Sequence, residues 1–266
     1  MKVLRRAVWL ALAGTMLIAP GQVFAAAEIH RLNLVLSSNP TSLRADDLNE
    51  FLGDFNTRYL QPKGLEPLEQ VSFTFLNEAE LRYFVRPNVS VTAGFGQIRA
   101  TSKREYLPRL GQRIELRTEV VAVPLQVGAT YYLAPYNQGD FQARAFVGGG
   151  LVTVTQGKVM FEQLEFATDS ATTLNPDGKP GSQRYKGRGD GPGYFFEAGG
   201  HMFFASRFSV MLGGYYRSAQ VRNLRITQDI INRDVETIGQ VPVYGDDTLD
   251  LDVGGMGLKL AVAIGF

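Results

Sequence analysis

Few side chains in this sequence have a type and spacing that could support acid–base or nucleophilic chemistry. The chain has two histidines, His30 and His201, and no cysteine, which removes thiol catalysis, disulfides and thiolate metal ligands. Glu197 lies four residues before His201, and on one face of a β-strand that spacing is roughly 13 Å, too far for a catalytic dyad. His30 has neither a serine nor an acid beside it. We therefore expect no catalytic residue, no metal site and no cofactor site.

The other polar residues of interest occur within strands that are otherwise amphipathic. In the last stretch, Met256–Phe266, every second residue is apolar and the residues between are small or polar, with Lys259 the only charge. Side chains of a strand alternate between its two faces, so one face of this strand is continuously apolar. The same alternation occurs in Glu69–Val85, where aromatic residues occupy one face and acidic and basic residues the other.

The pattern predicts an all-β fold, an eight-stranded antiparallel transmembrane β-barrel. The short connections (86–88, 134–140 and 205–207) alternate with long ones, as in barrels with short periplasmic turns and long external loops. A soluble barrel would instead place the apolar face inside. The expected strands are 28–37, 69–85, 89–96, 114–133, 141–155, 194–205, 208–217 and 256–266.

The long connections are expected to be loops. They cover 39–64, 99–112, 157–193 and 222–247. The first loop contains an apolar set at helical spacing, which predicts an amphipathic helix that covers the barrel rim, or alternatively a gate or plug. In strand 114–133 the apolar parity changes at Val120–Val121, which predicts a bulge, and Pro124 is unusual inside a strand. The helix positions are Leu48, Phe51, Leu52, Phe55 and Tyr59.

The N-terminus has the pattern of a secretory signal. Lys2, Arg5 and Arg6 precede an apolar run that is too short to span a membrane and ends at Pro20. We expect a signal peptide over residues 1–25 and a barrel domain over 26–266. The net charge of +1 gives no indication of a nucleic-acid partner.

In a narrow barrel the inward polar residues must pair with one another or be hydrated. Charges of both signs face inward, which predicts either an ion-paired interior that closes the lumen or the lining of a narrow path for solutes. The expected lumen polar network is Arg31, Glu78, Glu80, Arg82, Arg144, Glu197, His201, Arg217 and Lys259.

Three stretches resemble the small outer-membrane β-barrels of the OmpA, OmpX and OmpW type, in their barrel-only form. They are the strand–turn–strand Glu80–Phe95, the stretch Val123–Leu133, and the terminal Phe266. The C-terminus also resembles the assembly signal of such barrels, with Ala261 where the family usually has glycine. By this resemblance the signal residues are Lys259, Ala261, Ile264 and Phe266.

The resemblance implies a location in the bacterial outer membrane. The implied partners are outer-membrane lipid and, during biogenesis, the barrel-assembly machinery and periplasmic chaperones. The expected role is non-enzymatic: structural, or in interactions at the cell surface. The alternatives are a narrow gated channel for small or hydrophobic solutes and, less favoured, a lipid-modifying barrel enzyme.

Overall fold

The computed structural model describes most of the chain from His30 onward. The described residues are 30–109, 112–139, 141–167, 183–204, 207–222, 224–229, 243–244, 247–248 and 250–266. The signal peptide expected at residues 1–25 and the turn residues 205–206 lie outside them.

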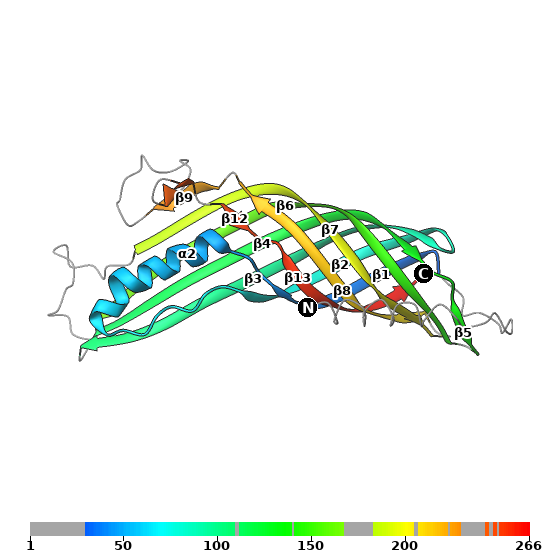
Figure 1. Cartoon of the computed structure of the whole chain (residues 1–266), viewed down its shortest axis with the longest axis horizontal. Helices are drawn as coiled ribbons and strands as arrows, with labels where there is room; N and C mark the ends of the chain where they lie inside the picture. Colours follow the sequence, from blue (N-terminus) through cyan, green and yellow to red (C-terminus); the bar gives the residue numbers. More distant parts are fainter. Residues whose placement is uncertain are drawn as a thin grey trace, which may run out of the picture.

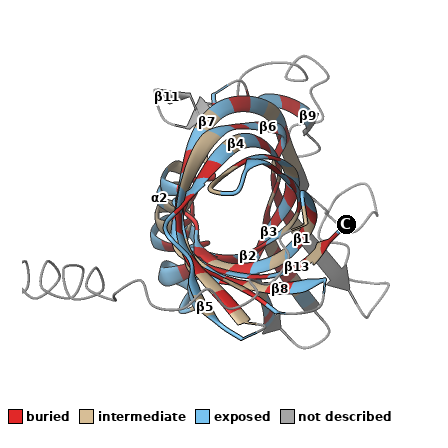
Figure 2. Cartoon of the chain, turned by 90° about the vertical axis from the view of Figure 1, so that its right-hand side faces the viewer, coloured by how far each residue is buried: buried red, intermediate tan, exposed pale blue. Residues whose placement is uncertain are grey.

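Eight long antiparallel strands form the wall of the molecule (Figure 1). In spatial order each strand is hydrogen-bonded to the next, and pairing between β7 and β8 completes the ring, which Figure 2 shows from one end. The chain is therefore a closed eight-stranded barrel, as the sequence predicts. The wall strands are β1 (Leu32–Ser42), β2 (Phe73–Arg86), β3 (Val89–Arg109), β4 (Gln112–Tyr132), β6 (Phe141–Ala167), β7 (Gln183–Phe203), β8 (Phe208–Val221) and β13 (Gly255–Gly265).

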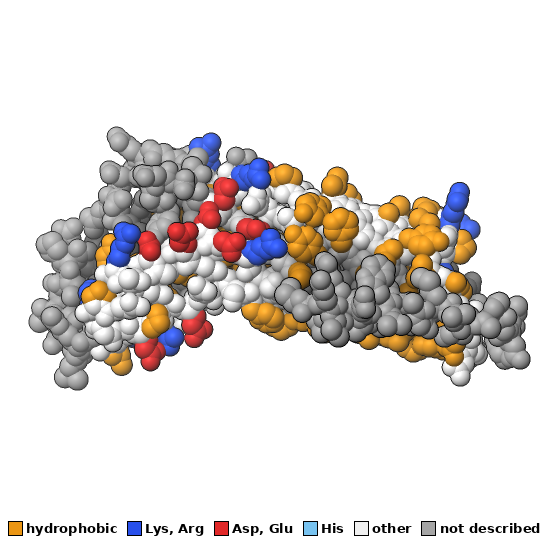
Figure 3. All heavy atoms as spheres, viewed as in Figure 1, with side chains coloured by type: hydrophobic (Ala, Val, Ile, Leu, Met, Phe, Trp, Pro, Cys, Tyr) orange, Lys and Arg blue, Asp and Glu red, His pale blue; other side chains and the backbone are white. Residues whose placement is uncertain are grey.

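A band of exposed apolar side chains surrounds one half of the barrel. Figure 3 shows these side chains gathered on the right of the molecule, with acidic and basic side chains further left. Exposed apolar surface of this extent faces lipid, so this half of the barrel crosses the membrane. The band includes Leu36, Phe75, Leu81, Tyr83, Val91, Phe95, Leu125, Val127, Tyr131, Val147, Leu151, Phe196, Phe208, Leu212, Met256, Leu258, Leu260, Val262 and Phe266.

The short connections all lie at the apolar end of the barrel. They are Pro87–Asn88 between β2 and β3, the segment between β4 and β6 that contains the short strand β5 (Tyr136–Gln138), and the β7–β8 connection. By the rule that periplasmic turns are short, this end faces the periplasm and the opposite end faces outward. The architecture is that of a bacterial outer-membrane barrel.

Beyond the apolar band, β3, β4, β6 and β7 continue as a paired sheet. The described parts of the segments 99–112 and 157–193, expected as loops, are strand: β3 pairs with β4 out to Arg109↔Gln112, and β6 pairs with β7 out to Gln163↔Gln183. The loop predictions were wrong because these segments are polar on their outer face. A strand that crosses the membrane has an apolar outer face, so a segment without one was interpreted as a loop. A strand that extends beyond the bilayer faces water, however, and its outer face is then polar.

The predicted bulge at Val120–Val121 is also wrong. The pairing of β3 with β4 keeps one register through this region, and inward residues keep the same parity along β4. Leu116 and Val120 are buried on the inner face, whereas Glu119 forms an ion pair with Arg99. The apolar face changes from the outside to the inside because the solvent outside changes from lipid to water. The register shift in this strand instead lies at Val123/Pro124, against β6, where a proline is tolerated.

The first long connection begins later than expected. β1 continues through Pro40 to Ser42 and pairs with β2 over its whole length. The helix α2 (Asp46–Phe55) follows, extended by a π-helical turn η1 (Asn56–Leu60) and a 3-10 turn η2 (Gln61–Lys63), and ends at Gly64 in the left-handed conformation. Among the described residues, no helix is long and apolar enough to cross a membrane.

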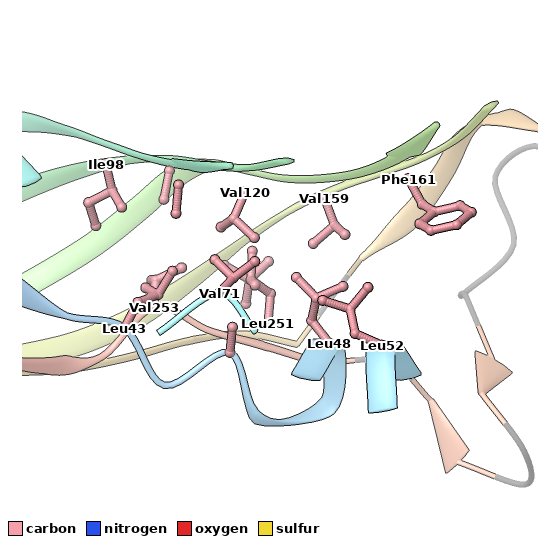
Figure 4. Packing of buried hydrophobic residues seen from close by; sticks show 14 of the residues in the cluster. Leu43, Leu48, Leu52, Val71, Ile98, Val120, Val159, Phe161, Leu251 and Val253 are labelled. Carbon is pink, nitrogen blue, oxygen red and sulfur yellow. The ribbon is translucent and has the colours of Figure 1, made fainter. Parts of the chain in front are cut away.

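The helix packs against the inner face of the extended sheet (Figure 4). Leu48 and Leu52 are buried, and Phe51 makes an edge contact with Phe161 of β6 at a ring-centroid distance of 5.5 Å. Tyr59, expected on the packing face, is 56% exposed, and its ring centroid lies 5.2 Å from that of Phe55. The helix thus fills the inside of the outer half of the barrel.

Two asparagines hold the chain that returns from the helix to the barrel wall. The Asn56 side chain accepts a hydrogen bond from Leu68 N at 2.8 Å and donates one to Leu68 O at 3.0 Å. Asn49 makes the same pair of bonds to Val71, at 2.8 and 3.3 Å. Seven residues are about two helical turns, so the two amides lie on one face and satisfy the backbone of a segment that has no strand partner there.

The fourth long connection is only partly described. β9 (Arg225–Asp229) pairs with β7 beyond the end of β8, and β12 (Leu251–Asp252) pairs with the end of β8. The two-residue strands β10 (Val243–Tyr244) and β11 (Asp247–Thr248) pair with each other. The segment expected as a loop therefore contains further strand pairing on the outer part of the sheet.

We expect Leu52→Ala to loosen the helix while the barrel stays folded. Leu52 is fully buried, and a buried leucine truncated to alanine costs about 2–5 kcal/mol. Limited proteolysis should cut the segment between α2 and β2 faster, while the heat-dependent gel shift of the folded barrel stays unchanged. Tyr59→Ala on the exposed side is the matched control and should behave as wild type. Equal cleavage of wild type and Leu52→Ala would contradict this packing role.

Candidate functional site: a polar cluster inside the barrel

The polar interior residues form a layer between two apolar layers, and β2 shows all three along its inner face. Leu76 belongs to the outer apolar cluster, Glu78, Glu80 and Arg82 follow, and Phe84 belongs to a second apolar cluster near the periplasmic end. That second cluster contains Val35, Phe84, Tyr132, Phe146, Phe203, Met211, Ala261 and Ala263. On β13, Lys259 lies between the lipid-facing Leu258 and Leu260, so the polar layer is at membrane depth.

Four charged side chains from three strands make the centre of this layer. Arg82 donates to Glu80 at 2.6 Å and to Glu197 at 2.9 Å. Lys259 contacts the same two carboxylates, Glu197 at 2.5 Å and Glu80 at 3.4 Å. All four residues are at most 6% exposed. Two cations thus alternate with two carboxylates, which offsets the large cost of removing each charge from water.

Neutral side chains extend the cluster toward the periplasmic end. Arg82 donates to the Tyr132 hydroxyl at 2.7 Å, and that hydroxyl lies 3.2 Å from His201 Nδ1. His201 Nε2 lies 2.8 Å from the Ser209 hydroxyl, and the ring stacks on Phe203 at a centroid distance of 3.9 Å. The histidine therefore has both ring nitrogens in hydrogen bonds.

Gly148 on β6 provides the space that one carboxylate of the cluster needs. A methyl group at this position would lie 3.0 Å from Glu197 Oε1 and 2.8 Å from Thr130 Oγ1, and those two oxygens are themselves hydrogen-bonded at 3.1 Å. Gly148 thus serves close side-chain packing inside a strand.

A small cavity of about 10 Å³ adjoins the cluster on its outer side. This volume has room for one water molecule. Its lining includes Glu78, Gln126, Glu197, Tyr215, Arg217 and Lys259, closed off by Leu76 and Phe195. The polar layer therefore crosses the lumen, and the cavity that adjoins its charged centre has no room for a solute larger than water.

The structure brings most, but not all, of the sequence-predicted network together. Arg217 donates to Val253 O at 2.9 Å and lines the cavity with Glu78. Arg144 lies nearer the periplasmic end, where it bonds Gln142 at 2.8 Å and the carbonyl oxygen of Pro87. Arg31 was predicted wrongly. It precedes β1 and is exposed at the rim. Its place in the alternation is an inward one, but an inward position buries a side chain only along the part of the chain that forms the barrel wall.

The alternation in the sequence places Thr130 and Ser209 inward, but it did not predict that they and Tyr132 are uncharged members of the cluster. Tyr132, Thr130 and Ser209 each bond a charged or imidazole group. Strand parity alone would have placed all three inward, but it carries no information about which inward residues meet across the lumen. The bond between His201 and Ser209 in particular joins residues on neighbouring strands.

The pair of Ser209 and His201 has the hydrogen bond of a nucleophile and its base, but its surroundings do not suit catalysis. Both side chains are buried, with His201 at 0% exposure. The third member, on Nδ1, is a tyrosine hydroxyl where a catalytic triad uses a carboxylate. The arrangement holds the imidazole in place between Tyr132 and Ser209.

The comparisons with known proteins give likenesses to solved outer-membrane proteins. Ail, the attachment invasion locus protein of Yersinia pestis, is 10% identical, with 89% of this chain and 98% of Ail covered and a TM-score of 0.30. Outer membrane protein AlkL, solved in lipid bilayers, is 15% identical, covering 94% and 97%, with a TM-score of 0.38. The Escherichia coli outer membrane protease OmpT is 9% identical, covering 92% and 99%, with a TM-score of 0.21.

No protein-family model and no curated protein sequence matches the chain. The class of protein, a small outer-membrane β-barrel, follows from the closed ring of strands and from the apolar band on its outer surface.

We expect Lys259→Ala to destabilise the folded barrel strongly. The change leaves Glu80 and Glu197 with one cation in place of two, and breaking a buried ion pair by removing one partner costs about 3–5 kcal/mol. The midpoint of urea unfolding in detergent micelles should fall accordingly. Lys103→Ala is the matched control and should change the midpoint little, because Lys103 is half exposed and its partner Glu115 keeps a second cation, Arg113, at 3.6 Å. An unchanged midpoint for Lys259→Ala would show that the pair does not stabilise the fold.

We also expect Gly148→Ala to weaken the barrel, because its methyl group would displace the Glu197 carboxylate from Thr130. Gly200 lies on the paired strand β7, and a methyl group there meets no atom within 4 Å. Gly200→Ala is therefore the control. Unfolding in urea should occur at lower concentration for Gly148→Ala only. Equal midpoints of urea unfolding in the two variants would contradict the packing role of Gly148.

Proposed function

We propose that this protein is a closed outer-membrane barrel with a structural or surface-interaction role. The observation that carries the proposal is the filling of the lumen. The charged layer lies between two apolar clusters, and the cavity beside it holds about one water molecule. A barrel filled in this way acts as a rigid anchor in the membrane.

The extended sheet is the part that such an anchor would present outside the membrane. From Ile98 to Arg109, β3 adds roughly 35 Å of strand beyond the apolar band. Its outer face and that of β4 carry cross-strand ion pairs, Arg99–Glu119 at 3.0 Å and Lys103–Glu115 at 3.0 Å. The inner face is packed by α2, so this sheet offers a rigid, charged surface of both signs.

The same observations support a non-enzymatic role. His201, the histidine inside the barrel, is fully buried and its two ring nitrogens are engaged by Tyr132 and Ser209. An enzyme acting on a lipid or a peptide would need such a group at a surface that its substrate can reach.

Electrical recording in planar lipid bilayers tests the proposal. The refolded barrel, verified by its heat-dependent gel shift, should insert and give no discrete single-channel steps. A conducting porin recorded in the same bilayers is the positive control. Reproducible steps from the wild-type barrel would contradict the proposal and support the narrow gated channel instead.

A further inference from the structure

The seam between β1 and β13 has a gap in its pairing. Their residues pair from Asn33↔Gly265 to Ser37↔Ala261 and then again at Thr41↔Gly257. The register is the same on both sides of the gap, so it is an unpaired stretch and not a bulge. On its other side β1 pairs with β2 without interruption, so the gap is confined to the seam.

Two neighbouring residues of β1 explain the gap. Pro40 has no backbone N–H to donate to β13. The side chain of Asn39 substitutes for part of the ladder: its Oδ1 accepts a hydrogen bond from Leu260 N at 3.1 Å, and its Nδ2 donates to Glu78 at 2.9 Å. The seam is thereby held from inside by a side chain tied to the polar cluster.

A groove of about 440 Å³ lies over this seam on the outside of the barrel. It spans three neighbouring strands, β1, β13 and β8, and lies within the lipid-facing band. It contains no charged side chain. Its lining is Leu36, Ser37, Ser38, Val210, Leu212, Leu260, Ala261 and Val262.

Beside the groove, a polar pair faces the lipid. The Ser38 hydroxyl donates to Asn77 Oδ1 at 2.8 Å, and both residues are exposed. In the part of the chain that the structure describes, the Asn77 amide nitrogen has no hydrogen-bond partner. An unsatisfied donor in contact with lipid is costly, so an acceptor from the surrounding membrane would be favoured at this position.

The depth of Asn77 in the membrane indicates which hydrogen-bond acceptor of the lipid its amide group can reach. It lies two residues, roughly 7 Å along the strand, from Phe75, which packs against Phe73 at a ring-centroid distance of 5.6 Å. Its cross-strand partner Gln97 is also exposed. Toward the outer end of β3, the exposed Phe95 is followed by Gln97 and then by Arg99, which pairs with Glu119, and this change from apolar to charged side chains marks the outer membrane–water interface. Ester carbonyl groups, which join acyl chains to a lipid head, lie at that level.

We propose that the groove binds one acyl chain of an ester-linked membrane lipid, with its ester carbonyl accepting a hydrogen bond from Asn77. The groove is concave, uncharged and apolar along its length, which fits a hydrocarbon chain. A second barrel would instead bring a wall of alternating bulky side chains, with no dedicated acceptor for Asn77. This site is separate from the lumen and goes beyond the proposed anchoring role.

Native mass spectrometry of the refolded full chain tests the site. The probes are dioleoyl phosphatidylethanolamine and its ether-linked analogue, which lacks the ester carbonyl groups. The wild-type barrel should retain one ester lipid through detergent exchange and should prefer it over the ether analogue by about five- to ten-fold, the effect of one hydrogen bond.

Two variants and one control separate the two parts of the site. Asn77→Leu should lose the preference for the ester lipid. Ser38→Phe, which fills the groove from an exposed position, should lose retention of both lipids. Gln97→Leu removes the same chemical group one strand further from the groove and should behave as wild type. The gel shift verifies that each variant is folded.

Three results would overturn the proposal. The first is a wild-type barrel that retains no lipid. The second is a preference for the ester lipid that is absent in the wild type or unchanged in Asn77→Leu. The third is a dimer in place of a lipid-bound monomer, which would assign the groove to a second copy of the chain.

Discussion

Backbone hydrogen bonding inside the lipid bilayer is the constraint on which the rest of this structure depends. Lipid offers no partner for a peptide N–H or C=O group, so a sheet that crosses a membrane must close on itself. Here the ring closes through β1 with β13 and β7 with β8. At the β1–β13 seam the pairing is interrupted at Pro40, and the Asn39 side chain supplies a hydrogen bond there.

Closure in turn determines what the interior must be. Eight strands leave room only for side chains, so each inward charge must find a partner within the lumen. Arg82 and Lys259 share the carboxylates of Glu80 and Glu197, and apolar layers lie on either side of this cluster. In the proposed closed barrel, the same residues also block the path that a solute would take.

The outer half of the barrel follows the opposite rule, because water replaces lipid outside it. Charged side chains of β3 and β4 turn outward and pair across strands, while Leu116 and Val120 turn inward beneath α2. One continuous strand therefore carries two opposite amphipathic patterns. The helix is required here, since without it the apolar inner face of the extended sheet would be open to water.

Alternation of side chains along each strand determined the fold class, the number of wall strands and the residues that face lipid, because that period is a local property of the backbone. Parity also placed Glu80, Arg82, Glu197 and Lys259 inside. Only the tertiary structure decided where the bilayer ends on each strand, and so which polar segments are strands and which residues, such as Arg31, lie beyond the lumen. Three further features depend on the tertiary structure alone. They are the hydrogen bond between His201 and Ser209, the contacts of Asn49 and Asn56 with the returning chain, and the groove at the β1–β13 seam. These features arise between strands distant in sequence, where register and solvent act together and no local pattern records them.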